Sequence, residues 1–158
     1  MNIRIKFFND TYNGDNALKS ADKKQNWIDL RASEDVTIKK GEFKLIPLGI
    51  AMQLPKGFVA KIRQRSSTTK NLKLVMATSG FIDNCYNGDT DEWAFYCYSI
   101  DKTSIHKGDR ICQFEVCLSQ YATIWQKIKW MFTKKIEFEF VSHLDNKSRG
   151  GHGSTGVK

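Results

Sequence analysis

The sequence predicts an all-β protein, a jelly-roll barrel or sandwich, on three observations. Apolar and polar residues alternate over residues 2–7 and again over residues 136–140, which is the period of a strand with one buried face. An apolar run over residues 58–62 directly follows a Pro-Lys-Gly turn. Short runs of this kind are separated by Gly, Pro and Asn turns along most of the chain, which is typical of sandwiches and barrels.

The first and last strands show the alternation most clearly. Ile3, Ile5 and Phe7 occupy one face at the N-terminal end, and Phe138 and Phe140 repeat the pattern near the C-terminal end. Between them, residues 43–54 include Pro47 and Gly49. Because proline cannot donate to a strand ladder, we expect this segment to form an edge strand or a bent one.

One segment, residues 121–135, departs from the strand period. Ile124, Ile128 and Met131 recur at helical spacing with lysines between them, which predicts a short amphipathic helix. We interpret the helix as a surface element that packs on its own barrel or at the edge of a trimer. The alternatives are contact with a membrane surface or with a partner protein.

The length of 158 residues fits a single domain, which we place at residues 1–148, followed by a flexible phosphate-binding arm at 149–158. No apolar run has the length needed to cross a bilayer, and residues 1–6 alternate instead of forming a signal peptide. The sequence therefore predicts a soluble cytoplasmic protein with no membrane partner.

Charge and cysteine content narrow the function classes. The four cysteines show no Cys-x-x-Cys spacing and indicate buried free thiols, and the three histidines are too scattered for a zinc site. The net charge of +8 comes largely from lysines spread over predicted turns and strand edges, without a basic recognition helix. We therefore expect no specific nucleic-acid partner, and a triphosphate ligand would suit the excess of positive charge.

The last ten residues combine glycines, hydroxyl side chains and cations in a stretch with no apolar residue before Val157. Glycines let backbone N–H groups approach phosphate oxygens, hydroxyls add donors, and the guanidinium of Arg149 is suited to phosphate. The stretch is not a Walker loop, because no Gly-Lys-Ser/Thr follows the glycines. By itself, it could equally be a solvated terminus.

Four further segments contain residue types that nucleotide chemistry uses: Asp29-Leu30-Arg31-Ala32, Arg65-Ser66-Ser67, residues 80–88 (Gly-Phe-Ile-Asp-Asn-Cys-Tyr-Asn-Gly) and residues 107–113 (Lys-Gly-Asp-Arg-Ile-Cys-Gln). In this order, together with the tail, they resemble the five motifs of the homotrimeric dUTP diphosphatases (dUTPases). The resemblance spans roughly residues 27–156 and is greatest to the enzymes of Bacillus and its phages. It implies hydrolysis of dUTP to dUMP and pyrophosphate, in dUTP clearance and dTTP precursor supply.

The resemblance gives the third motif the central chemistry. It implies that Asp83 activates the water that attacks the α-phosphorus, although Asp83 alone would suit a residue that caps a hairpin turn. Backbone groups of the same segment, which includes Gly80 and Ile82, would recognise uracil. Tyr86 would stack under deoxyribose and crowd a 2′-hydroxyl.

The phosphates would be held by the remaining motifs. The resemblance implies contacts from Arg65, Ser66 and Ser67, from the amide of Gln113, and from the tail residues Arg149, Gly153, Ser154 and Thr155. Asp109 and Arg110 suit structural positions, as a turn carboxylate and an ion-pair partner.

The first-motif aspartate, Asp29, would help hold Mg²⁺ through the water shell of the ion, as suits a cation that dehydrates reluctantly. Two departures from the family pattern stand out. Asn26-Trp27 replaces the usual Ala-Gly before this motif, and His152 replaces the Phe that closes over uracil. We therefore consider Trp93 as a second lid candidate, since its charged neighbours suggest a pocket rim; a buried strand residue is the alternative.

The resemblance also implies a homotrimer in which adjacent subunits share each active site. Two other functions compete with this one. A dCTP deaminase of the same superfamily shares the Arg-Ser-Ser and Ile-Asp features, but we find no additional glutamate beside the substrate loop to drive deamination. A regulator that uses the dUTPase scaffold to bind a protein is the second, kept open by residues 121–135.

Overall fold

The computed structural model describes residues 1–19, 26–133 and 135–150, and these residues form mostly strands. Two helices, α1 (Thr68–Leu72) and α2 (Ile124–Phe132), and two 3-10 turns, η1 (Asp10–Tyr12) and η2 (Gly14–Asn16), accompany them. The strands are β1 (Asn2–Phe7), β2 (Ile28–Arg31), β3 (Val36–Ile38), β4 (Phe43–Pro47), β5 (Ile50–Gln53), β6 (Phe58–Gln64), β7 (Leu74–Met76), β8 (Gly80–Ile82), β9 (Ala94–Ser99), β10 (Thr103–Ile105), β11 (Arg110–Leu118) and β12 (Glu137–Phe140).

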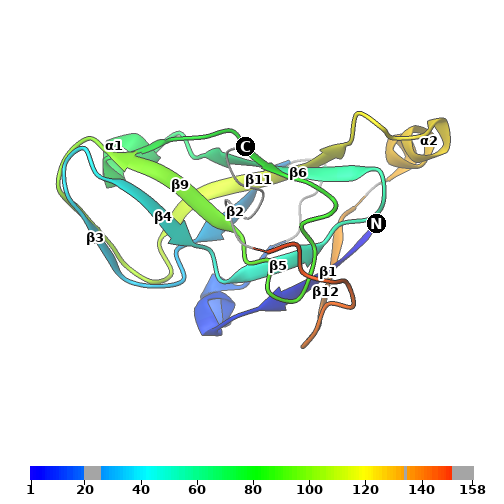
Figure 1. The fold of residues 1–158 in the computed structure, drawn as a ribbon, viewed down its shortest axis with the longest axis horizontal. Helices are drawn as coiled ribbons and strands as arrows, with labels where there is room; N and C mark the ends of the chain where they lie inside the picture. The colour runs from blue at the N-terminus through cyan, green and yellow to red at the C-terminus, as the bar shows by residue number, and fades with distance from the viewer. Residues whose placement is uncertain (20–25, 134, 151–158) are drawn as a thin grey trace.

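The strands assemble into small sheets wrapped around one core (Figure 1). The largest has the order β2-β11-β6-β8, and two others have the orders β12-β1-β5 and β4-β9-β7; β10 pairs with β3. Pairing is antiparallel except between β12 and β1, which run parallel. The chain thus has the all-β jelly-roll fold that the sequence predicts.

The strands predicted at both ends and at 58–62 are confirmed as β1, β12 and β6. The segment 43–54 bends as expected: β4 and β5 are separated at Gly49, whose φ of 67° is in the left-handed region. Both strands are at the edge of their sheets, so Pro47 removes no donor from a central ladder.

The core centres on large side chains with no exposed surface. Trp93 meets Phe114 of β11 edge-on, with ring centroids 5.3 Å apart and an interplanar angle of 89°. Aliphatic side chains from every sheet surround this pair. Within the described residues, neither helix is both long and apolar enough to cross a membrane.

The predicted helix at 121–135 is confirmed as α2, and a capping box between Thr123 and Gln126 fixes its start. It packs on its own barrel, as we interpreted it, although none of its residues is fully buried. The Gln126 amide donates to the Lys56 carbonyl at 2.9 Å, and the Trp130 ring meets Phe58 at 5.3 Å. The apolar side chains Ile124, Trp125, Met131 and Phe132 are exposed. The helix lies at one end of the molecule (Figure 1).

The four cysteines are free thiols, as predicted, but they are not uniformly buried. Cys97 and Cys112 lie in the core, Cys117 is half-buried, and Cys85 is exposed in the loop that follows β8. Burial raises the pKa of Cys97 to about 11, so this thiol is inert at neutral pH.

Candidate active site

Residues from the first, second and fourth motifs meet at one end of the largest sheet. The Asp29 carboxylate on β2 forms ion pairs with the Arg65 Nε at 2.8 Å and with the Arg110 Nη1 at 3.1 Å. Gln113 lies directly opposite Asp29 in the β11–β2 register. We call Asp29, Arg65, Arg110 and Gln113 the Asp29 cluster. It presents two guanidinium groups around one carboxylate, which is a net positive surface for phosphate.

The Arg-Ser-Ser triplet sits where β6 passes into α1. Ser67 is the N-cap of α1, and its side chain makes no capping hydrogen bond; Ser66 is exposed. The next residue, Thr68, is buried and ties this turn to β11, since its hydroxyl donates to the Ile111 carbonyl at 2.9 Å and accepts from the Arg65 amide at 3.2 Å. Thr68 therefore fixes the backbone from which Arg65 extends.

The donor set of the Asp29 cluster limits how a metal ion can bind there. Both carboxylate oxygens of Asp29 are already engaged by guanidinium groups. No group of three or more His, Cys, Asp or Glu that could hold a metal occurs in the described part of the chain. This donor set does not form a protein cage, but it fits a Mg²⁺ that keeps its waters and takes its other ligands from substrate phosphates.

The third motif begins on β8 and continues into a loop, residues 83–92, which we call the Asp83 loop. We expected a hairpin here, but β8 pairs with β6 while β9 pairs with β4 and β7, so the loop instead crosses between two sheets. Asp83 is exposed at its start. The Asn84 amide anchors the loop by donating to the carbonyls of Leu54 and Pro55, at 2.7 and 3.0 Å.

Tyr86 is held firmly at two points within the same loop. Its backbone N–H donates to the Asp83 carbonyl at 3.0 Å, and its hydroxyl donates to the Glu92 carbonyl at 2.9 Å. Burial raises the pKa of the Tyr86 phenol to about 12, so the hydroxyl stays protonated and keeps donating. The ring is half-buried and forms a fixed wall of the loop.

Arg149 approaches the Asp83 loop from the C-terminal side. Its Nη1 lies 3.9 Å from Asp83 Oδ2 and donates to Cys85 Sγ at 3.1 Å. The structure thus brings Gly80, Ile82, Asp83, Tyr86 and Arg149 together as a second group, with the Ile82 side chain buried beneath them. His152, Gly153, Ser154 and Thr155 lie outside the described residues.

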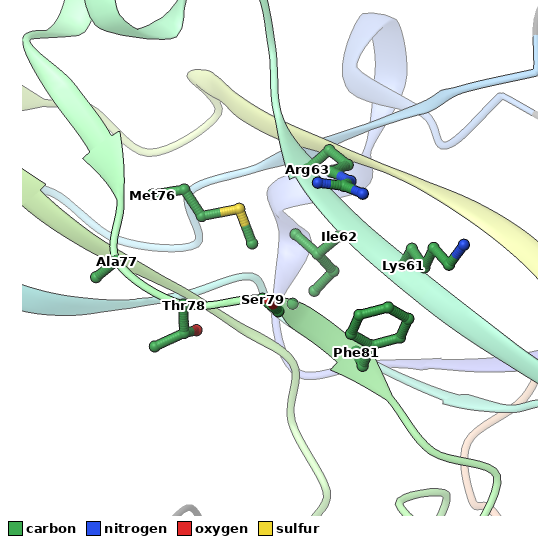
Figure 2. Close-up of a pocket in the computed structure, with 9 residues that line it drawn as sticks. Lys61, Ile62, Arg63, Met76, Ala77, Thr78, Ser79 and Phe81 are labelled. Carbon is green, nitrogen blue, oxygen red and sulfur yellow. The ribbon is translucent and has the colours of Figure 1, made fainter.

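A pocket of about 330 Å³ opens beside this group, between β6 and the segment that joins β7 to β8. Figure 2 shows it between Lys61, Ile62 and Arg63 on one side and residues 76–81 on the other. The Lys61 ammonium lies 5.6 Å from the centre of the Phe81 ring. Gly80 lines the pocket but Asp83 does not, so this hollow does not by itself unite the predicted chemistry.

The Asp29 cluster and the Asp83 loop lie at opposite ends of β6. In the β6–β8 register Ile82 faces Ala60, so Asp83 leaves the sheet near Val59, while Arg65 follows the other end of the strand. At about 3.3 Å per residue, about six residues of strand separate the two groups by roughly 20 Å. A general base must come within about 3 Å of the water it activates. One copy of the chain therefore does not bring the two groups to one reaction centre.

The interpretation of Trp93 as a lid is wrong. Trp93 has no exposed surface and packs edge-on to Phe114. Its charged neighbours do not mark a pocket rim, because they are directed at backbone groups. Asp91 is 1% exposed and accepts from the Gly88 amide at 2.8 Å, and Glu92 accepts from the Gly49 amide at 2.8 Å.

Arg110 and Asp109 have the structural positions expected of them, as ion-pair partner and turn carboxylate. Sequence reasoning missed Thr68, Asn84 and Asp91, which hold the loops that carry the site residues. An Asn or Asp inside a glycine-containing loop is a weak signal of such a contact, since these residues often bond to nearby backbone.

Comparison with known proteins identifies the arrangement. A family model described as dUTPase matches residues 17–156. The chain belongs to the dUTPase family. The SPbeta prophage-derived deoxyuridine 5′-triphosphate nucleotidohydrolase YosS of Bacillus subtilis is 45% identical to this dUTPase, over the full length of both chains. A deoxyuridine 5′-triphosphate nucleotidohydrolase of Rickettsia bellii is 36% identical, over 82% of this chain and 80% of its own.

Solved phage dUTPases share the fold. A point mutant of the dUTPase from phage phi11 of S. aureus superposes with a TM-score of 0.65 at 15% identity, covering 77% of this chain and 94% of its own. The dUTPase of Staphylococcus bacteriophage 80alpha gives a TM-score of 0.63 at 18% identity, covering 77% and 93%. The recognition made from the five motifs is therefore confirmed at the level of the family.

Proposed function

We propose that this dUTPase hydrolyses dUTP to dUMP and pyrophosphate in the cytoplasm, with Asp83 as the general base. The Asp83 carboxylate accepts a proton from water as the water oxygen bonds to the α-phosphorus. The bond from that phosphorus to the α,β-bridging oxygen breaks, and its electron pair leaves with pyrophosphate. The observation that carries the proposal is an exposed Asp83 beside Arg149, in a chain that belongs to the dUTPase family over nearly its whole length.

The other residues bind and orient the substrate. Arg65, Ser66, Ser67 and Gln113 contact the phosphates; support comes from the exposed Ser66, from a Ser67 side chain that makes no capping bond, and from the positive charge around Asp29. Tyr86 stacks under deoxyribose, and its two anchors keep the ring from yielding to a 2′-hydroxyl. Gly80 and Ile82 set the backbone that reads uracil. His152 stacks over uracil as the lid, and Gly153, Ser154 and Thr155 complete the phosphate contacts from the tail.

A Mg²⁺ ion bound with the triphosphate would offset part of its negative charge. Asp29 would hold the water shell of the ion, a role that fits a carboxylate already engaged by two guanidinium groups. The protein itself keeps Asp29 oriented through Arg65 and Arg110.

We further propose a homotrimer whose subunits share each active site, supported by the roughly 20 Å between the Asp29 cluster and the Asp83 loop in one chain. Mixing subunits tests this directly. Asp83→Asn and Arg65→Ala chains, each inactive alone, should recover activity when they are unfolded and refolded together, with roughly a quarter of the sites intact under random assembly. If the refolded mixture sediments as a trimer but recovers no activity, the proposal of a shared site is contradicted.

The substrate is tested by pyrophosphate release from each deoxynucleoside triphosphate and from UTP. We expect dUTP to be preferred over UTP by at least about tenfold, which a steric clash of roughly 1.4 kcal/mol would give. Ammonia release from dCTP would instead assign the chain to the deaminases of the superfamily. Equal turnover of dUTP and dTTP would contradict uracil recognition.

A second function, binding of a protein partner, is favoured by α2. At about 100° per residue, Ile124, Trp125, Ile128, Met131 and Phe132 form one stripe, and it faces solvent. Lys127 and Lys129 flank the stripe on its two sides, and the sequence contains no Asp or Glu between Glu115 and Glu137. We infer that the stripe fits an apolar groove with an acidic rim on another protein.

To test this, a protein captured from host cells is purified and its affinity for the dUTPase measured. Affinity should fall for the Trp125→Ser/Phe132→Ser variant and for Lys127→Glu, and not for Ile100→Ser, an exposed apolar control on another element. Loss of the trimer in the double variant would assign the stripe to a neighbouring subunit. Binding of wild type to phosphatidylglycerol vesicles would assign it to a membrane. Either result would overturn the protein-partner proposal.

A further inference from the structure

The segment that follows β12 lies closely along the Asp83 loop. We call residues 143–149 the strap. The Leu144 amide donates to Asp89 Oδ1 at 3.0 Å, Asn146 forms a parallel bridge with Gly88, and the Thr90 amide donates to Ser148 Oγ at 2.9 Å. A β-carbon at Gly88 would lie 2.3 Å from Ser148 Cα, so the two backbones touch. Contacts at Leu144, Asn146 and Ser148 therefore hold the strap along the loop, and Arg149 follows directly.

Asp91 joins the loop and the strap through one carboxylate. Its Oδ2 accepts from the Gly88 amide at 2.8 Å, and the Arg149 amide donates to Oδ1 and Oδ2 at 3.0 and 3.1 Å. Asp91 is 1% exposed and is the sole charged side chain among the buried polar residues of the described chain. A buried carboxylate is costly unless its oxygens are hydrogen-bonded. Here backbone N–H groups supply those bonds.

The two residues that donate to Asp91, Gly88 and Arg149, belong to different parts of the candidate active site. Gly88 belongs to the loop that carries Asp83 and Tyr86, and Arg149 carries the guanidinium that lies 3.9 Å from Asp83 Oδ2. An arginine side chain has many rotamers, so the direction in which it reaches depends on where its backbone is fixed. The Asp91 carboxylate fixes the Arg149 backbone with respect to the loop.

We propose that Asp91 is a positioning residue that sets the place of Arg149 at the active site. The inference rests on the proposed dUTP hydrolysis, in which Arg149 contacts the phosphates. Asp91 itself is shielded from solvent and acts through the Arg149 amide and the Gly88 amide. Asparagine cannot replace it, because both carboxylate oxygens accept and an amide NH₂ would face the Arg149 N–H or the Gly88 N–H.

The test is a double-mutant cycle on the full-length protein, with Asp91→Asn, Arg149→Ala and both together. We expect Asp91→Asn to raise the KM for dUTP about tenfold, as loss of one charge-assisted hydrogen bond would. If Asp91 acts through the Arg149 side chain, the double variant should be no worse than Arg149→Ala alone, because no guanidinium is left to position. Asp145→Asn, on the strap but exposed, is the matched control and should leave KM unchanged.

Two results would show that Asp91 is only structural and would overturn the proposal. One is that the two substitutions raise the KM for dUTP multiplicatively. The other is that Asp91→Asn lowers the melting temperature and leaves KM normal. A measurement on the wild type keeps the test independent of variant folding: the Gly88 and Arg149 amides should be protected from hydrogen exchange. Free exchange at Arg149 would overturn it. A wild type that releases no pyrophosphate from dUTP would instead contradict the proposed function, while the exchange result would still report on the Asp91 contact.

Discussion

The Asp83 loop and helix α2 place their side chains in opposite ways. The Asp91 carboxylate in the loop and the Trp93 indole directly after it are buried. On α2, Trp125 and Phe132 are 76% and 77% exposed. The carboxylate is buried because the N–H groups of Gly88 and Arg149 donate to it. The indole is buried because it packs edge-on to Phe114 of β11. In the described residues, the apolar stripe of α2 meets no such surface, so residue type predicts burial only together with the partners that the fold supplies.

The largest effect should come from the loop. Asp83→Asn keeps the size of the side chain and removes its basicity, so kcat should fall by roughly 10² to 10⁴. Folding should be unaffected, because the side chain is 66% exposed. Steady-state kinetics with dUTP measures the loss, and Asp101→Asn, exposed on the β9–β10 turn, is the control. Near-full activity of Asp83→Asn would make Asp83 a turn residue only.

Two tryptophan truncations compare the regions directly. Trp93→Ala should lower the free energy of unfolding by about 3–5 kcal/mol, because it opens a cavity against Phe114. Trp125→Ala should change it by less than about 0.5 kcal/mol, since the side chain has little to lose on the protein surface. Urea titration followed by circular dichroism measures both. Equal losses would mean that α2 is covered within the assembly.

The close approach of loop and strap gives the next effect. Gly88→Ala places a methyl group 2.3 Å from Ser148 Cα, and backbone cannot yield as a side chain can. We expect a loss of about 1–3 kcal/mol in unfolding free energy, together with faster amide exchange in residues 143–149. Gly41→Ala is a control in which the added β-carbon meets no atom within 4 Å, although its φ of 75° also strains the backbone. If Gly88→Ala and Gly41→Ala lose comparable unfolding free energy, contact with Ser148 does not explain the effect at Gly88.

The smallest effect concerns pH. A hydrogen bond from the Lys6 ammonium, with one from the Leu144 amide, lowers the pKa of Asp89 to about 2. Because the folded-state pKa lies below the unfolded value, the stabilisation is present above about pH 4 and is lost as the pH falls toward about 2. The difference in unfolding free energy between wild type and Asp89→Asn should therefore shrink over this range. If the difference in unfolding free energy stays constant with pH, the lowered pKa of Asp89 does not contribute to stability.

Sequence patterns predicted the parts of the fold that local physics determines. The alternation of Ile3, Ile5 and Phe7 predicted β1, and the helical spacing over residues 124–131 predicted α2. The family motifs named residues that the structure places side by side, such as Arg65 with Asp29 and Arg149 with Asp83, while their roles stay predictions. They could not predict that Trp93 is internal, because its burial depends on Phe114, which is distant in sequence. The outward face of α2 was likewise unpredictable, since periodicity gives a stripe but not its direction.

The parallel pairing of β1 with β12 has a consequence for the order of events during synthesis. β1 emerges from the ribosome before β5 and can pair with it early, but its other edge must wait for β12, which is made long after β5. Such a distant pairing closes a long loop and slows the final step of folding. Until then β1 offers an open edge on which a second nascent chain could pair. The acidic residues Glu137 and Glu139 in β12, opposite Asn2 and Arg4, favour the correct partner over a second copy of β1.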